Sequence, residues 1–255
     1  MSTALLNPPC PGWLSDLPGP FQTPNVPASL GNDHPNHLDE IYLEVSRRSS
    51  HSRGFLIWCS ILFACFIVWS AKGTFLNEHG DLATTIAWWV TIVISLWSCL
   101  VFFRMDVGPP RDLPIRFNRA RQRIYAYNFR SRWWNPFEHW RVDPVAYDWA
   151  QVRAERWKKR GATAQGAIIF KWGVVLSIVK PGTNEVIDRF HLSTMGADEF
   201  AWAYICTYMQ LGQEALPPPG LSRASNAAPW YNLALLLAPK VKWPADMDRE
   251  SRTAP

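Results

Sequence analysis

The sequence predicts an α+β membrane protein: a two-helix transmembrane hairpin followed by a small antiparallel β domain that a C-terminal helix closes. The hairpin is predicted from residues 54–71 and 82–103, which are runs of 18 and 22 residues without Asp, Glu, Lys, Arg or His. A bilayer core takes about 20 helical residues to cross, so each run is long enough to span it. The β domain is predicted from residues 111–215, where short β-rich stretches alternate with turn residues before a helical stretch.

The N-terminal part is expected to lack a compact fold. Residues 1–38 are rich in proline and hold few sustained apolar clusters, which predicts a disordered, cytoplasmic tail. In residues 39–53, the apolar positions Ile41, Tyr42 and Val45 recur at helical spacing and predict an amphipathic segment that leads into the membrane.

The two apolar runs are expected to be helices, because main-chain polar groups in lipid must be satisfied within the segment. Neither run carries an ionisable residue, which favours an anchor over a transport path. The alternative, two core helices of a soluble protein, would require a large apolar partner surface that the rest of the chain does not supply. Close packing within the hairpin, or in a homo-oligomer, is predicted from small residues at four-residue spacing: Ser60, Ala64, Thr91 and Ser95.

Charged residues beside the runs predict the orientation. Arg47, Arg48 and Arg53 precede the first run, and six arginines follow the second within about 20 residues, whereas residues 72–81 carry only Lys72. Nine cations against one predict that both termini are cytoplasmic and that residues 72–81 form a ten-residue loop outside.

The expected elements of the β domain follow one another along the chain. The first are strands on either side of a turn at 118–122, then a strand at 145–149 that leads into a short helix or strand through 157. A strand at 167–179 with a bend or turn at Gly173, a turn at 181–184, a strand at 186–192 and a helix that ends near Gly212 follow. Residues 216–255 are expected to be largely irregular, with a short helical run at 230–237. Strands followed by one closing helix are also the order of a pleckstrin-homology-like barrel, an analogy at the level of fold that implies no ligand.

Two segments of the chain, residues 114–125 and 146–155, resemble motifs of an uncharacterised proteobacterial family of membrane proteins, and residues 237–244 fit it as well. Members of that family join two transmembrane helices to a cytoplasmic domain of unknown function, and their genes often lie near type VI secretion and polymorphic-toxin genes. The resemblance implies toxin immunity or an accessory role in secretion. It assigns no catalytic residue.

A basic segment follows the second apolar run. Residues 104–160 hold fourteen Lys or Arg and six Asp or Glu, whereas residues 161–255 hold eight of each. The excess of cations favours contact with anionic lipid headgroups; docking to an acidic protein is a second interpretation, and nucleic-acid binding is the least favoured. The expected surface residues are Arg116, Arg119, Arg121, Arg123, Arg130, Arg132, Trp133, Trp134 and Trp140.

Tryptophan is unusually frequent, with 15 residues in a chain of 255. The cluster from Trp133 to Trp140 has two interpretations: core packing in a small barrel, or a loop at headgroup level, where the indole ring is favoured. The sequence leaves this choice open, with core packing slightly preferred.

The motifs of common enzyme classes are absent from the sequence, including G-x-S-x-G, the P-loop, H-E-x-x-H and the dinucleotide-binding glycines. We therefore expect a non-enzymatic interaction protein without a metal or cofactor. Its expected partners are the lipid bilayer and one protein, which is either a toxin or a secretion component. An accessory subunit of an envelope or secretion machine is the alternative, and an enzyme is the third.

Overall fold

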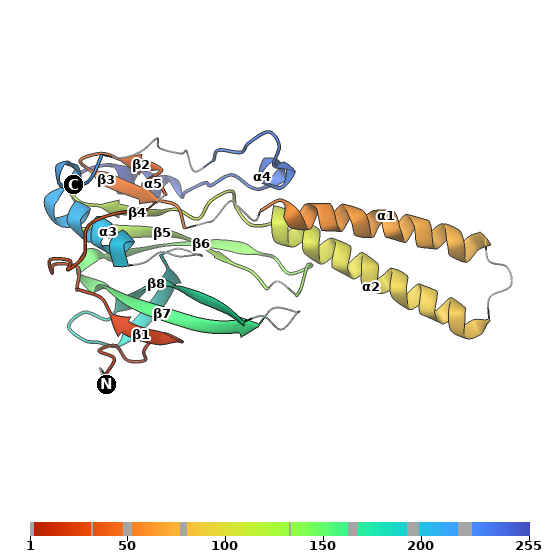
Figure 1. Cartoon of the computed structure of the whole chain (residues 1–255). Coiled ribbons are helices and arrows are strands. Elements are labelled where there is room, and N and C mark those ends of the chain that lie inside the picture. The colour runs from red at the N-terminus through yellow and green to blue at the C-terminus, as the bar shows by residue number, and fades with distance from the viewer. Residues whose placement is uncertain are drawn as a thin grey trace.

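A computed structural model describes residues 3–31, 33–47, 53–76, 81–132, 134–162, 168–192, 199–218 and 226–255. A long helical hairpin projects from one end of a domain that contains two β-sheets (Figure 1). This confirms the predicted combination of an apolar helical hairpin with antiparallel sheets.

The hairpin consists of α1 (Phe55–Leu76) and α2 (Leu82–Val107), both long and apolar enough to cross a membrane. Each helix is longer than its apolar run, so α1 continues into the expected loop, and residues 77–80 lie outside the described residues. Asp81 caps α2 by accepting a hydrogen bond from the Thr84 amide. α2 ends at Gly108, where Trp140 leaves no room for a Cβ atom.

Only part of the predicted small-residue ladder lies between the two helices. Ser60 and Ser95 are buried there, and the Ser60 hydroxyl donates to the Cys99 carbonyl oxygen at 3.1 Å. Ala64 is instead exposed, and the Thr91 hydroxyl bonds the Ala87 carbonyl oxygen of its own helix. The contact face of α1 passes through Phe63, whose ring meets Phe102, and this turns Ala64 away from the partner helix.

All named strand pairs in the two sheets are antiparallel. One sheet has the order β2 (His37–Leu38), β3 (Tyr42–Val45), β4 (Ile115–Asn118), β5 (Arg123–Arg130), β6 (Arg141–Asp148). The other has the order β1 (Trp13–Asp16), β7 (Val152–Ala162), β8 (Ile168–Val179), β9 (Val186–His191). A 3-10 turn at Trp149–Gln151 joins β6 to β7, so the chain passes from one sheet to the other there.

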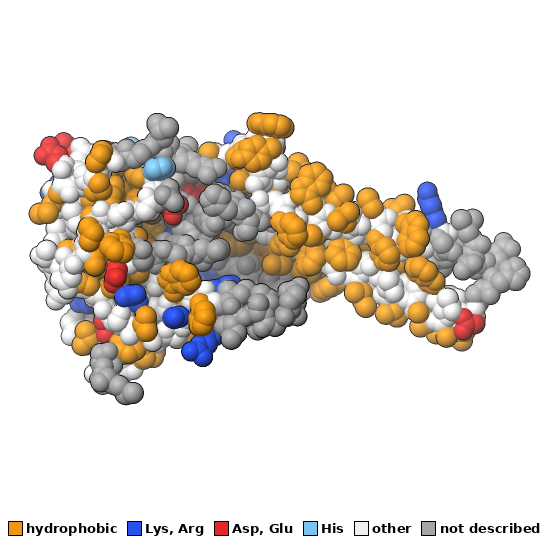
Figure 2. All heavy atoms as spheres, in the orientation of Figure 1, with side chains coloured by type: hydrophobic (Ala, Val, Ile, Leu, Met, Phe, Trp, Pro, Cys, Tyr) orange, Lys and Arg blue, Asp and Glu red, His pale blue; other side chains and the backbone are white. Residues whose placement is uncertain are grey.

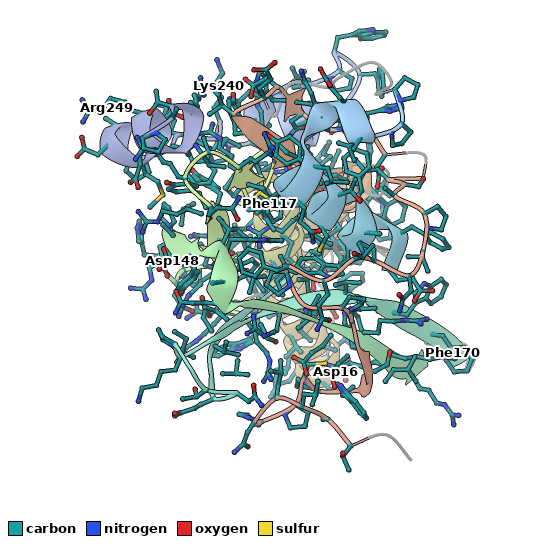
Figure 3. The ribbon with its side chains drawn as sticks, turned by 90° about the vertical axis from the view of Figure 1, so that its left-hand side faces the viewer. Asp16, Phe117, Asp148, Phe170, Lys240 and Arg249 are labelled. Atoms are coloured by element: carbon teal, nitrogen blue, oxygen red, sulfur yellow. The ribbon has the colours of Figure 1, made fainter. Side chains whose placement is uncertain are left out.

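The core lies between the two sheets and α3 (Glu199–Leu211). Three large aromatic side chains are fully buried there or nearly so: Phe117 of β4, Trp149 and Trp202 of α3. The Trp149 ring contacts the Phe117 ring on one side and the Trp202 ring on the other. Figure 3, which looks at the end of the domain opposite the hairpin, has Phe117 near its centre and Arg249 and Phe170 at the periphery. Burying three large aromatic rings supplies much of the driving force that unites the two sheets.

The N-terminal part departs from the expected disordered tail, because much of it is built into the domain. β1 pairs with β7, and Leu6 and Cys10 are buried. The indole N–H groups of Trp149 and Trp202 donate to the carbonyl oxygens of Pro20 and Pro18, so this proline-rich stretch serves as acceptor for two buried donors.

The amphipathic helix expected in residues 39–53 is wrong where the structure describes that segment. Tyr42–Val45 forms β3, and Leu43 lies opposite Phe117 of β4. The helical spacing of Ile41, Tyr42 and Val45 competes with a period of two at Leu43 and Val45, both buried in the core. Pairing with β4 decides between the two patterns, as tertiary context commonly does.

The boundaries expected for the β domain, residues 111–215, are too narrow. The N-terminal strands and the C-terminal helix α5 (Ala245–Arg252) also belong to it. Within the expected range, the strands around the 118–122 turn, β9 and α3 are confirmed, and Gly212 ends α3 with a φ of 92°. β8 continues through Gly173, so the bend expected there is wrong.

Candidate functional site at the hairpin root

The two helices enter the domain together at what we call the hairpin root, Arg53–Ile57 with Arg104–Arg111. The Arg53 guanidinium is buried there and donates to the carbonyl oxygens of Asp106, Pro109 and Pro110 at 2.9, 2.5 and 2.7 Å. The last carbonyl groups of a helix have no partner within it, and here a single side chain supplies donors where α2 ends.

Asp106 makes the reciprocal contact from α2 to α1. Its carboxylate accepts hydrogen bonds from the amides of Gly54 and Ile57, each at 3.0 Å, and so caps the first turn of α1. A negative charge at a helix N-terminus is further stabilised by the helix dipole. Gly54 has a φ of +105°, a conformation that favours glycine.

Asn232 completes the connection from the C-terminal part of the chain. Its side-chain amide donates to the Arg53 carbonyl oxygen at 2.9 Å, and its oxygen accepts from the Leu235 amide at 3.0 Å, capping α4 (Leu233–Leu237). We call Arg53, Asp106 and Asn232 the root latch. Because its bonds join α1, α2 and α4, the latch holds these three helices together at the root.

The loop between β5 and β6 lies beside α2. Arg104 donates to the carbonyl oxygens of Pro136 and Glu138, and its guanidinium stacks over the Trp140 ring at 4.9 Å from the centroid. The Phe137 ring meets Trp97 of α2 at a centroid distance of 5.8 Å. This loop therefore follows the last turns of α2 outwards from the domain.

The aromatic residues of this loop include both packed and exposed side chains, the two possibilities that the sequence left open. Trp140 is half-buried and packs against Phe129. Trp134 and Phe137 are 55% and 71% exposed. Trp133 lies outside the described residues. The cluster thus combines one packing residue with an outward apolar surface next to the hairpin.

The segment around α4 presents a second apolar surface at the root. α4 lies against α2, and Ala234 and Leu235 are buried. Arg111 holds the segment by donating to the carbonyl oxygens of Asn226 and Leu236, each at 3.0 Å. Figure 2 shows hydrophobic side chains over this region and along both helices. Its large exposed side chains are Trp230, Tyr231, Leu233, Leu236 and Leu237.

The fold separates the arginines that were expected at the surface. Arg130 and Arg132 lie near the root, exposed and paired with Asp143 and Glu138. Arg116 lies within β4, Arg119 and Arg121 lie in the turn that follows it, and Arg123 begins β5. The turn and the loop that contacts α2 lie at opposite ends of β5, and Arg116 is buried, so these arginines do not gather in one place.

The distal arginines hold the C-terminal segment in place. Arg116 is buried and pairs with Glu44 at 2.6 Å and Asp248 at 2.7 Å. Arg123 pairs with Glu250, and Arg121 donates to the carbonyl oxygens of Thr253 and Ala254. The Arg119 side chain lies against Gly212 after α3. These contacts give Arg116, Arg121 and Arg123 a structural role that composition alone did not reveal.

A buried carboxylate in β7 was also missed by the sequence analysis. Glu155 is fully buried, accepts hydrogen bonds from the Cys10 amide and the Ser177 hydroxyl, and lies 3.4 Å from Arg189. Burial, followed by the charge of Glu155, raises the pKa of the Cys10 thiol to about 11. The contacts attach the N-terminal segment to β7. Within the described ranges, no three His, Cys, Asp or Glu side chains gather as a metal-binding group.

Replacing Arg53 by alanine removes the donors that serve the carbonyl oxygens of Asp106, Pro109 and Pro110. We expect the full chain in detergent micelles to lose about 3 kcal/mol of unfolding free energy, since unsatisfied buried acceptors are costly. Chemical denaturation measures this loss, and tryptic cleavage within residues 104–111 should accelerate in parallel. Arg132→Ala, at an exposed site, is the control and should change stability by less than about 0.5 kcal/mol. Equal stability and cleavage of the two variants would contradict the role of the latch.

Comparison with known proteins adds a family but no activity. No curated protein and no solved structure matches the chain. The model of a family of unknown function, DUF6708, matches residues 92–236, more than half of the chain. The matched region runs from the middle of α2 through β4–β9 and α3 into α4, and so includes Asp106 and Asn232 of the root latch. The chain therefore belongs to the family of unknown function DUF6708.

Proposed function

We propose that this chain is a non-enzymatic interaction protein anchored in a bacterial inner membrane, with its β domain held against the cytoplasmic face. The observation that carries the proposal is the pair of helices, which the root latch holds together and which are covered with exposed apolar side chains. Such a surface is stable only when something apolar covers it. The exposed side chains include Phe55, Trp58, Leu62 and Trp69 on α1 and Trp89, Val93, Ile94 and Trp97 on α2.

The arrangement of charge supports an anchor with both termini in the cytoplasm. Residues 55–71 and 82–103 carry no ionisable side chain, so the hairpin offers no polar path at membrane depth. Arg53 and Arg104 lie where the helices leave the domain, and the opposite turn has Lys72 with Glu78 and Asp81. This asymmetry favours the domain on the cytoplasmic side.

The topology of the domain supports a pleckstrin-homology-like fold. Two antiparallel sheets enclose one core, and α3 follows β9 and packs into that core. The fold alone names no ligand, so the proposal is an interaction domain that a rigid anchor holds at a constant height beneath the bilayer.

Reporter fusions test the orientation. Fused at the C-terminus of the full chain, a fluorescent protein that matures only in the cytoplasm should be bright, and alkaline phosphatase should be inactive. The same phosphatase inserted between residues 76 and 81 should be active, because that turn is expected in the periplasm. Alkaline carbonate should leave the chain in the membrane pellet. An active phosphatase at the C-terminus, or release by carbonate, would contradict the proposed anchoring.

For the partner we propose a toxin, which would make the chain an immunity protein; the support is its resemblance to membrane proteins whose genes lie near toxin genes. Co-expression of the full chain with the toxin encoded beside it should restore growth. Failure to protect against any adjacent toxin would refute immunity. Recovery of secretion-machine subunits by the full chain, without protection, would instead establish the accessory role.

A further inference from the structure

We propose that residues 229–238 form a third membrane contact, an interfacial segment whose aromatic and leucine side chains enter the boundary between lipid headgroups and acyl chains. The inference rests on the proposed membrane anchoring and adds a site that neither apolar run contains. Its occupant is the phospholipid of the bilayer in which the hairpin lies.

The segment exposes most of its large apolar side chains, while Leu235 and the small side chains of Ala234 and Ala238 are buried. Trp230 and Tyr231 are 86% and 70% exposed, and Leu237 is 53% exposed, whereas Ala234 is fully buried. For a surface in water this arrangement is unfavourable, since each large apolar side chain left exposed forgoes the favourable free energy of leaving water. The outward side chains are held there by a defined structure rather than by a frayed end: Asn232 caps α4 and bonds Arg53, and Arg111 bonds the Leu236 carbonyl oxygen.

The position of the segment places this surface at the level where the hairpin leaves the domain. α4 packs against α2 beside the start of α1 (Figure 1). The β5–β6 loop also reaches α2, where Phe137 meets Trp97. The exposed apolar side chains of α4 are therefore continuous with those of the helices, and a bilayer that covers the helices extends to them.

The composition of the segment fits a lipid interface. Trp and Tyr are the residues enriched at the boundary of the hydrocarbon core, and Leu is favoured within it. Lys240 and Lys242 follow directly and are exposed, and residues 226–243 contain no Asp or Glu. Exposed cations beside an apolar segment complement the phosphates of phospholipids. An acidic protein could use the same lysines, and the test below separates it from lipid.

Photo-crosslinking tests the contact at single positions of the full chain. p-Benzoylphenylalanine replaces Trp230, and matched variants carry it at Phe21 or at Trp69. Phe21 is 62% exposed and adjoins Gln22, whose carbonyl oxygen accepts from Gln210 of α3, at the end of the domain opposite the hairpin. Trp69 is 65% exposed on α1 and reports whether the hairpin itself is in lipid. Each variant is irradiated in nanodiscs of phosphatidylcholine and phosphatidylglycerol, and the intact mass is measured.

We expect phospholipid adducts at positions 230 and 69 and no adduct at position 21. An adduct at 69 without one at 230 would overturn this inference and leave the membrane anchor intact. Absence of adducts at both positions would overturn the anchor as well. In whole cells, a protein adduct at 230 in place of lipid would also refute the lipid contact, because the surface would then be a protein interface.

Discussion

The reciprocal capping of the two helix termini by Arg53 and Asp106 is the constraint on which the rest of the structure depends. Arg53 precedes α1 and satisfies carbonyl groups at the end of α2, whereas Asp106 lies near the end of α2 and caps α1. Each helix thus completes the terminus of the other. Both side chains are buried, so their charges must be satisfied locally, and the two helices can enter the domain only as a pair in this register.

The latch also determines what surrounds the hairpin. Asn232 bonds the Arg53 main chain and begins α4, and Arg104, within one turn of Asp106, holds the β5–β6 loop against α2. The exposed apolar side chains of the β5–β6 loop and of α4 are thus both held beside the helices by residues of the hairpin root. In the proposed membrane setting, the latch lies at the boundary between water and lipid, where unpaired main-chain groups are increasingly costly. In that proposed setting, the paired helices would hold the domain close to the bilayer.

Local patterns in the sequence predicted the helical hairpin, the β4–β5 turn, β9 and α3, because charge-free runs and strand alternation are properties of neighbouring residues. Long-range contacts determined the rest. β3 is a strand because it pairs with β4, and the N-terminal prolines are ordered because Trp149 and Trp202 need acceptors. The same limit explains the candidate site: clustering along the chain grouped Arg116 with Arg132, although β5 separates them. Arg53 and Asp106 are 53 positions apart, and only packing of α1 on α2 brings them together.

Hydrogen exchange at the start of α1 tests the central claim, that Arg53 and Asp106 cap the two helices and hold them as a pair at the root. The amides of Gly54 and Ile57 would be unpaired at a free helix N-terminus, but here they donate to Asp106. Measured in the full chain in nanodiscs, these amides should exchange as slowly as those in the centre of β5, and Asp106→Ala should release them to the rate of an unpaired amide. Rapid exchange in the unmodified chain would contradict the claim, because Asp106 would then not cap α1.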